Sequence, residues 1–335
     1  MTSFNPSIEE LTERVEIELA RFLDERRSLD EATPMIDEIA RLLEAGGKRL
    51  RPAFCYWGYR ASGGENDVAA SKAAASLELL HTFAIVHDDI MDSSDERRGS
   101  PTTFAAHGVN VALLVGDLAL VLADDAFMHS GFSPEALTRA FDCYSRMRQQ
   151  VIAGQYLDVV ISDRHGVTVQ AARRIAVLKS GRYSIEEPLL IGAALAGAPE
   201  HLSKGLSRFG APLGEAFQLR DDLLGTFGDR SSIGKPVDSD IREGKRHVLY
   251  AKTIELLGDA AGGFIERWGG GDALTEGDVK ELREVIDGSG AREATEKLLV
   301  DLRTEAMEAL AVLPIGNEPR AALAELARRA TERNL

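Results

Sequence analysis

The sequence predicts an all-α protein that forms a single large bundle of long helices. Apolar residues recur at the three- and four-residue spacing of amphipathic helices, and several Ala- and Leu-rich stretches are long and nearly apolar on all sides. Alternating strand patterns with tight Asn-Gly or Asp-Gly turns are absent. We find neither a fixed-period repeat nor a flexible linker. We therefore expect one domain over 1–335, with its motifs within about 40–250 and further helices over 251–335.

The predicted helices can be placed along the chain. The first covers 8–27, where Ile8, Leu11, Val15 and Leu19 recur on one face. Three Ala- and Leu-rich helices are predicted to lie in the interior, packed on several sides, at 67–92, 104–130 and 173–198. The stretch 292–313 predicts an amphipathic helix that closes the bundle, and we assign it no chemistry.

The charge balance, the apolar runs and the cysteines exclude several classes of protein. A formal net charge of −15 disfavours nucleic acid or an anionic membrane as the main partner. No uninterrupted apolar run reaches the roughly 18 residues of a membrane span, and the charged N-terminal region lacks the apolar core of a signal peptide. Only Cys55 and Cys143 are present, which suits a reducing compartment. We expect a cytoplasmic protein without stable membrane insertion and without a nucleic-acid partner.

The stretch HDDIMD, residues 87–92, concentrates negative charge at the end of a predicted apolar helix. Asp88, Asp89 and Asp92 stand at i, i+1 and i+4, so we expect all three carboxylates to project from one side. Neighbouring carboxylates repel one another unless a positive group lies between them. This pattern suits Mg²⁺, which takes one or two carboxylates, keeps water ligands and bridges to substrate phosphates. His81 lies two turns earlier, nearly in line with Asp88.

A second acidic cluster lies in FQLRDDLLGTFGD, residues 217–229. Asp221 and Asp222 are adjacent, with Gln218 one turn earlier on the same face. Gly225 occupies the position of a third aspartate, and Asp229 can serve only if the helix continues that far. Two such clusters that face one another would form a cage for several divalent ions and a polyanion.

Positive charge gathers at five places in this acidic chain, mostly beside glycines. Glycine lets backbone N–H groups approach an anion closely, arginine's planar fork suits phosphate oxygens, and lysine acts as a point charge. The five groups are Lys48, Arg49 and Arg51; Arg97 and Arg98; Lys179 and Arg182; Lys235; and Lys245. Together with the aspartates, they predict binding of a magnesium diphosphate.

With these motifs in place, the chain resembles the trans-isoprenyl diphosphate synthases, or polyprenyl synthetases. The family's signatures appear in the family order as GGKRLRP, HDDIMDSSDERRGSPT, GQYLD, KSGRYS, FQLRDDLLGTFGD and GKPVDSDIREGK. The resemblance implies a prenyltransferase domain of the isoprenoid synthase type, a bundle of long helices around a deep central cavity. It also implies a homodimer that uses isopentenyl diphosphate and allylic diphosphates.

The resemblance implies metal-binding roles for the aspartates and diphosphate-binding roles for the cations. Magnesium on the allylic diphosphate would be held by Asp88, Asp89 and Asp92. Another magnesium would be held from the opposite wall by Asp221 and Asp222. The allylic diphosphate itself would be contacted by Arg97, Lys179, Lys235 and Lys245. The diphosphate of isopentenyl diphosphate would be bound by Lys48, Arg51, His81 and Arg98.

Other matching positions are implied to lie near the reacting centre, namely Gln155, Asp158 and Gln218. Two positions depart from the family pattern. Ser180, which we assign to the substrate-binding set with Gln218, stands where threonine is usual and keeps the hydroxyl. Gly225 replaces the last aspartate of the second motif, so we expect coordination there through fewer carboxylates or through water.

The implied reaction is a magnesium-dependent, head-to-tail prenyl transfer. Departure of pyrophosphate from dimethylallyl, geranyl or farnesyl diphosphate would leave an allylic carbocation, which the isopentenyl double bond would attack before a proton is lost. The sequence offers no obvious Ser–His–Asp or Cys–His arrangement. We therefore expect catalysis by electrostatic stabilisation of the leaving group.

In this family, the residues four and five before the first aspartates act as a gauge of product length. Ala84 lies one turn from Asp88 and leaves space on its side, whereas the role of Phe83 as a stop rests on the resemblance. One bulky residue at this pair is typical of geranylgeranyl diphosphate synthases. A farnesyl product or a longer polyprenyl product is the alternative.

Two other functions share part of this pattern. A class I terpene cyclase would have a magnesium-binding aspartate cluster in an all-α cavity, but it would not need the second diphosphate site that GGKRLRP and Arg98 indicate. A non-catalytic regulatory subunit of a prenyl synthase could have lost its aspartates, whereas here only Gly225 departs. A purely structural helical protein gives no reason for aspartates opposite glycine-flanked cations.

Overall fold

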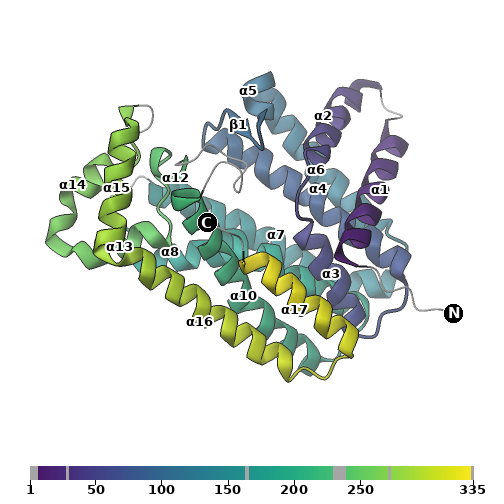
Figure 1. Ribbon diagram of the computed structural model, residues 1–335. Coiled ribbons are helices and arrows are strands. Elements are labelled where there is room, and N and C mark those ends of the chain that lie inside the picture. The colour runs from purple at the N-terminus through teal and green to yellow at the C-terminus, as the bar shows by residue number, and fades with distance from the viewer. Residues whose placement is uncertain (1–6, 28–29, 163–165, 229–238, 271–272, 333–335) are drawn as a thin grey trace.

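The computed structural model describes residues 7–27, 30–162, 166–228, 239–270 and 273–332 (Figure 1). Within these ranges the regular structure is helical apart from one hairpin of two-residue strands, β1 (Glu96–Arg97) and β2 (Ser100–Pro101), so the predicted all-α class is confirmed. The N-terminal helices are α1 (Ile8–Arg26), α2 (Thr33–Glu44), α3 (Leu50–Ala61), α4 (Asp67–Met91), α5 (Thr103–His107) and α6 (Val109–Met128). The central helices are α7 (Pro134–Ser162), α8 (Val169–Ile175), η2 (Ala176–Glu186), α9 (Glu187–Leu195) and α10 (Glu200–Phe227). The remaining helices are α12 (Ser239–Arg242), α13 (Val248–Leu257), α14 (Gly262–Arg267), α15 (Glu276–Ser289), α16 (Ala291–Ala311) and α17 (Asn317–Thr331), and short 3₁₀ turns cover Asp30–Ala32 and Gly258–Ala261.

The predicted N-terminal helix forms as α1. Ser7 caps it by accepting a hydrogen bond from the backbone N–H of Glu10, whose carboxylate accepts one from Ser7 in return. The apolar face predicted from the spacing is buried, since Leu11, Val15 and Leu19 are at most 3% exposed. The predicted closing helix also forms, as α16, and it packs along α10 (Figure 1).

Helix α10 joins the two apolar clusters of the molecule. Leu213 and Phe217 belong to a larger cluster that takes in α1, α3, α4 and α9, whereas Leu219 and Leu223 belong to a smaller one formed with α13, α15 and α16. Because α10 packs on both sides, the residues near its C-terminal end are held rigidly between the clusters.

Two expectations about the long apolar stretches need correction. Helix α6 is not interior on all sides, because one face is 40–61% exposed at Val109, Val111, Leu113, Leu114, Val121 and Met128. The stretch 173–198 is not one α-helix, since the π-helix η2 separates α8 from α9. Helical periodicity in the sequence cannot distinguish an exposed apolar face from an interior one, nor a π turn from an α turn.

None of the helices in the described residues has the length and apolar character needed to span a membrane. Cys55 is buried, Cys143 is partly buried, and neither forms a disulfide.

Candidate functional site

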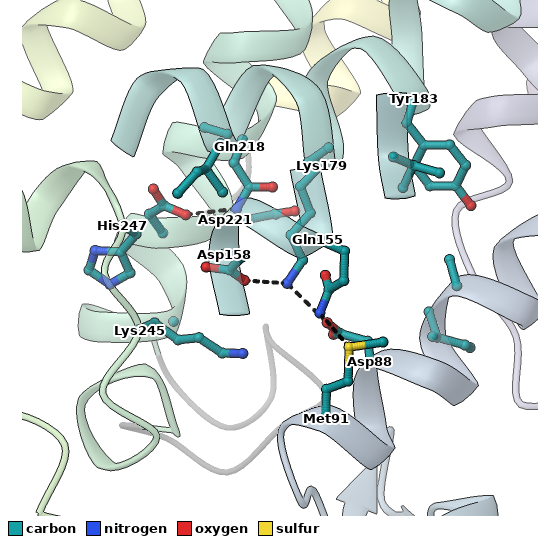
Figure 2. A pocket seen from close by; sticks show the side chains of 18 of the residues that line it. Asp88, Met91, Gln155, Asp158, Lys179, Tyr183, Gln218, Asp221, Lys245 and His247 are labelled. Atoms are coloured by element: carbon teal, nitrogen blue, oxygen red, sulfur yellow. Dashed lines mark hydrogen bonds and ion pairs between the residues drawn. The ribbon is translucent and has the colours of Figure 1, made fainter. Parts of the chain in front are cut away.

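A cavity of about 890 Å³ opens between α4, α7, η2 and α10, and residues of both aspartate motifs line it (Figure 2). The predicted polar residues on its wall are Arg51, His81, Asp88, Arg97, Arg98, Gln155, Asp158, Lys179, Ser180, Gln218, Asp221, Asp222 and Lys245. The predicted gauge residues Phe83 and Ala84 also line it. Five predicted residues are not on the wall, namely Lys48, Arg49, Asp89, Asp92 and Arg182, and Lys235 and Asp229 lie outside the described residues.

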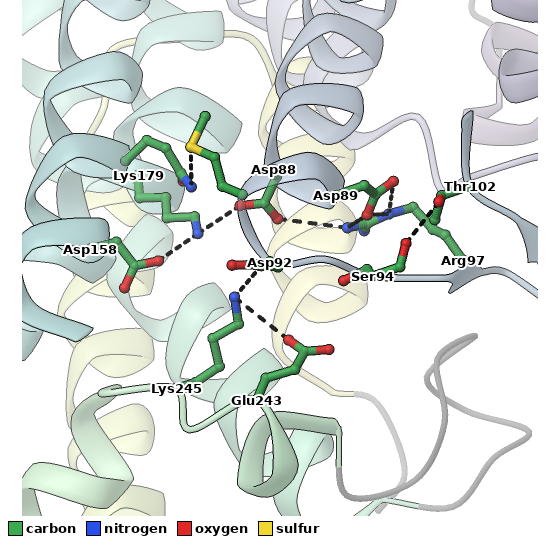
Figure 3. A network of polar contacts seen from close by, with 12 residues as sticks. Asp88, Asp89, Asp92, Ser94, Arg97, Thr102, Asp158, Lys179, Glu243 and Lys245 are labelled. Atoms are coloured by element: carbon green, nitrogen blue, oxygen red, sulfur yellow. Dashed lines mark hydrogen bonds and ion pairs between the residues drawn. The ribbon is translucent and has the colours of Figure 1, made fainter. Parts of the chain in front are cut away.

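The first aspartate motif stands at the C-terminal end of α4, where each carboxylate meets a different cation (Figure 3). Asp88 accepts a hydrogen bond from Lys179 Nζ at 2.9 Å, and Asp92 pairs with Lys245. Asp89 accepts two hydrogen bonds from Arg97, at 2.8 Å from Nε and 2.6 Å from Nη2.

The expectation that all three carboxylates project from one side is wrong for Asp89. One residue advances an α-helix by about 100° around its axis, so the side chain of Asp89 turns away from that of Asp88. Asp89 is 2% exposed and is buried against Arg97. Arg97 therefore contacts the first aspartate motif on one side, and Lys179 contacts it on the other.

Lys179 links the first motif to α7, because its Nζ also donates to Asp158 at 2.6 Å. Burial alone would raise the pKa of Asp88, but the nearby charges of Lys179, Lys245 and Arg97 outweigh it and hold that pKa below its usual value. Burial likewise opposes the charge of Lys179, yet Asp88 and Asp158 raise its pKa above the usual value. The network therefore keeps a carboxylate and an ammonium ionised inside a confined space.

The π-helix η2 brings Lys179 to the cavity, and glycines allow its close packing. A Cβ atom at Gly154 on α7 would lie 2.4 Å from the backbone nitrogen of Lys179, and one at Gly181 would lie 2.8 Å from the carbonyl carbon of Gly214 on α10. The sequence analysis connected the glycines beside the cations with close approach to an anion, whereas here Gly181 lets η2 approach α10. Single π segments occur frequently at functional sites because they shift the register of one side chain.

The second aspartate motif lies on the last turns of α10. Gln218 Nε2 donates to Asp222 Oδ1 at 2.7 Å, while the other oxygen, Oδ2, is buried without a hydrogen-bond partner among the described residues. Burial raises the pKa of Asp222 to about 6, and Asp240 and Asp221 add to the increase against the opposing effects of His247 and Gln218. A buried carboxylate oxygen without a donor fits a bound cation. Helix α10 ends at Phe227, and Asp229 lies outside the described residues.

Arg51, His81 and Arg98 also line the cavity, together with Tyr183. The guanidinium of Arg51 stacks 4.4 Å from the Tyr183 ring centre, and the Tyr183 hydroxyl lies 3.3 Å from His81 Nδ1. Burial and the charges of Arg51 and Arg98 lower the pKa of His81 well below its usual value, so the imidazole is neutral at pH 7. Arg98 donates to the carbonyl oxygen of Gly46, which joins GGKRLRP to the first motif.

The other cations of GGKRLRP differ in their surroundings. Lys48 is exposed. Arg49 is 5% exposed, and its Nη1 donates to the buried carboxylate of Glu78 at 2.6 Å. Arg49 thus ties α3 to α4 rather than facing the cavity.

The wall beyond the charged groups is apolar. Phe83 packs edge-on against His87, with ring centres 4.8 Å apart. Other apolar lining residues are Ala84, Ile85, Val151, Ile152, Ala172, Ile175 and Ala176. The cavity therefore combines a charged region with space for a hydrocarbon chain.

The structure adds lining residues that the sequence interpretation did not assign: Tyr183, Asp240, Arg246 and His247. All four lie in or next to stretches already recognised, KSGRYS and GKPVDSDIREGK. The side chain of His247 is 9% exposed, and its Nε2 lies 3.8 Å from Asp240 Oδ2. Their closeness in sequence to these two stretches could have suggested them. The local sequence does not indicate, however, that their side chains point into the cavity.

The described residues hold no group of three His, Cys, Asp or Glu side chains arranged to bind one metal ion. This does not conflict with a magnesium site, because Mg²⁺ uses one or two carboxylates and completes its shell with water and substrate phosphates. Asp88 and Asp222 offer carboxylates of that kind from two walls of one cavity.

Comparison with known proteins points to one family. Residues 33–286 match the family model described as "Polyprenyl synthetase". A geranylgeranyl diphosphate synthase from Sulfolobus acidocaldarius is 40% identical over 222 residues, which span 64% of this chain and 65% of that relative, just under two thirds. A geranylfarnesyl diphosphate synthase from Aeropyrum pernix is 37% identical over 76% of this chain and 80% of the relative. The crystal structure of geranylgeranyl pyrophosphate synthase from Corynebacterium glutamicum, complexed with isoprenyl diphosphate and magnesium, matches with a TM-score of 0.93 and 36% identity over 98% of this chain and 100% of that chain.

Proposed function

Because the chain belongs to the polyprenyl synthetase family, we propose that it is a prenyltransferase that condenses isopentenyl diphosphate with an allylic diphosphate to give geranylgeranyl diphosphate and pyrophosphate. One observation carries this proposal. The two aspartate motifs, the lysines beside them and a separate arginine–histidine group all line the same cavity, whose remaining wall is apolar.

Asp88 on one wall, with Asp92 one turn further along the chain, and Asp221 and Asp222 on the other wall are proposed to hold magnesium on the allylic diphosphate. When bound, magnesium would neutralise charge that develops on the departing pyrophosphate. Lys179 and Lys245 already lie against the first motif, within reach of the same phosphates. The direct metal contact predicted for Asp89 stays a prediction, since Arg97 occupies its carboxylate.

The diphosphate of isopentenyl diphosphate is proposed to bind at Arg51, Arg98 and His81. Arg51 is oriented by Tyr183 and by Ser184, whose Oγ accepts a hydrogen bond from Arg51 Nη2 at 2.8 Å. A neutral His81 can donate from one ring nitrogen while the other meets the Tyr183 hydroxyl. The roles predicted for Lys48 and Lys235 stay predictions.

The protein's contribution to the chemistry is proposed to be positioning and electrostatics. Lys179 and Lys245 stabilise negative charge on the leaving oxygen, which lowers the barrier to breaking the allylic carbon–oxygen bond. The apolar wall excludes water, so the isopentenyl double bond rather than water attacks the cation. The proton lost in the last step passes to the released pyrophosphate, because no side chain is required as a strong base.

The proposed product is geranylgeranyl diphosphate, with a farnesyl or longer product as the alternative. Phe83 is the one large side chain of the gauge pair, and both Phe83 and Ala84 line the apolar part of the cavity. The small Ala84 leaves room beside Asp88, and the Phe83 ring limits the depth available to the growing chain.

The chain is also proposed to act as a cytoplasmic homodimer. One face of α6 is apolar and exposed, and Phe141 on α7 is exposed as well. An apolar face that is exposed to solvent favours burial against a second copy of the chain.

The test separates prenyl transfer from terpene cyclisation and from a non-catalytic role. Pyrophosphate release from geranyl diphosphate is measured with magnesium, with and without isopentenyl diphosphate. The proposal expects release only when both substrates and magnesium are present. Hydrocarbon release from geranyl diphosphate alone would instead support a cyclase, and no release in any mixture would support a regulatory subunit.

A further inference from the structure

The side chain of His87 supports the ring of Phe83 at the cavity wall. The two residues are four apart on α4, a spacing that brings side chains together on one helix face. Their ring centres lie 4.8 Å apart with the ring planes at 67°, an edge-on contact. Both side chains line the cavity. The position of the Phe83 ring therefore depends on where the imidazole of His87 lies.

Helix α6 holds the imidazole of His87 in turn. The Nε2 atom lies 3.3 Å from the carbonyl oxygen of Leu113 and 3.7 Å from Oδ1 of Asp117, both on α6. A carbonyl oxygen can only accept a hydrogen bond, so Nε2 carries the proton and donates it to Leu113. This contact fixes the orientation of the ring, whose side chain is 16% exposed.

Gly116 on α6 provides the space in which this imidazole lies. A Cβ atom at Gly116 would lie 2.3 Å from His87 Nε2 and 2.4 Å from its Cδ2. Non-bonded heavy atoms in contact normally lie about 3.5–4.0 Å apart, so any side chain at 116 would displace the ring by about 1 Å or more. Because α6 blocks one side, the room for that displacement lies toward Phe83 and the cavity.

We propose that His87 is a specificity-determining residue, which rests against Gly116, fixes the ring of Phe83 and so sets the depth available to the product. This inference rests on the proposed function, since the depth matters only to a growing prenyl chain. One methylene more or less in an apolar pocket changes discrimination by about 10- to 200-fold. A displacement of the imidazole by about 1 Å is therefore large enough to change the ratio of products.

The experiment measures product length. The full chain is incubated with magnesium, isopentenyl diphosphate and geranyl diphosphate, and the dephosphorylated products are sized by chromatography. The variants are Gly116→Ala, His87→Ala and the two combined. Gly288→Ala is the matched control, because this exposed glycine on α15 is not on the cavity wall and a Cβ atom there would meet nothing within 4 Å. A thermal melt confirms that each variant is folded.

The two single variants should change the product in opposite directions. Gly116→Ala should raise the ratio of farnesyl to geranylgeranyl product by about tenfold, because the displaced imidazole narrows the cavity. His87→Ala should raise the ratio of longer products to geranylgeranyl product by about tenfold, because the Phe83 ring loses its support and can turn aside. The double variant should lose the shortening, since no imidazole is left to displace. Gly288→Ala should give the products of the unaltered chain.

Two results would overturn the inference while leaving the proposed function intact. One is a folded Gly116→Ala variant with an unchanged product ratio, and the other is a double variant that shortens the product as much as Gly116→Ala does. If Gly116→Ala does not fold, His87→Ala decides alone, and an unchanged ratio in that variant overturns the inference. Failure of the unaltered chain to elongate geranyl diphosphate would overturn both the inference and the proposed function.

Discussion

Replacing Phe83 by alanine should lengthen the product. Phe83 lies on α4, lines the cavity and packs edge-on against His87. The substitution removes about six carbon atoms from the wall, roughly the size of one five-carbon isoprene unit. We therefore expect the main product to change from geranylgeranyl to geranylfarnesyl diphosphate. Because Phe83 is only partly buried, the cost in stability should stay below the roughly 3 kcal/mol of a fully buried Phe→Ala change.

The assay is chromatography of the dephosphorylated products after incubation with magnesium, isopentenyl diphosphate and farnesyl diphosphate. Phe132→Ala is the matched control, since this partly buried ring packs against Tyr59 and does not line the cavity. The control should leave product length unchanged. A Phe83→Ala enzyme that still stops at geranylgeranyl diphosphate would refute the assignment of Phe83 as the limit.

Three other substitutions test separate parts of the account. Asp88→Ala should lower turnover by about 10²- to 10³-fold, measured as pyrophosphate release, because one preorganised stabiliser of the leaving group is lost; near-normal turnover would contradict its role. Glu78→Ala should lower the free energy of unfolding in urea by about 3–5 kcal/mol, because the buried Arg49 keeps only the half-exposed Glu16 as an acidic partner. A loss below about 1 kcal/mol would show that the pair matters little. His81→Asn should flatten the pH dependence of the free energy of unfolding. The pKa of His81 is lowered in the folded state, so the unfolded chain takes up a proton at a higher pH than the folded one. The free energy of unfolding should therefore be unaffected by His81 above about pH 6.5 and should fall below it by up to about 1.4 kcal/mol per pH unit. The same slope in both proteins between pH 6.5 and 5 would contradict the lowered pKa.

Local spacing was enough to predict the helices and the acidic clusters. The apolar face of α1 and the alignment of Gln218 with Asp222 follow from helical periodicity alone, and the structure places both as expected. The cavity and the cations around Asp88 were predicted through the family resemblance, and the structure brings Lys179 and Lys245 to the first motif from distant parts of the chain.

Other features of the site depend on tertiary packing and could not be predicted from residue spacing. Asp89 is absent from the cavity wall because its carboxylate is buried against Arg97, which follows in the hairpin. The π register of η2 depends on the close approach that Gly181 and Gly214 allow. Asp240 reaches the face of α10 across the fold, so no pattern within the second motif indicates it.

The central claim is that the charged and apolar parts of this one cavity together elongate an allylic diphosphate. The most direct test incubates the purified chain with magnesium, isopentenyl diphosphate and each allylic primer in turn, then sizes the dephosphorylated products. The account predicts geranylgeraniol as the dominant product. No elongation with any primer would contradict it.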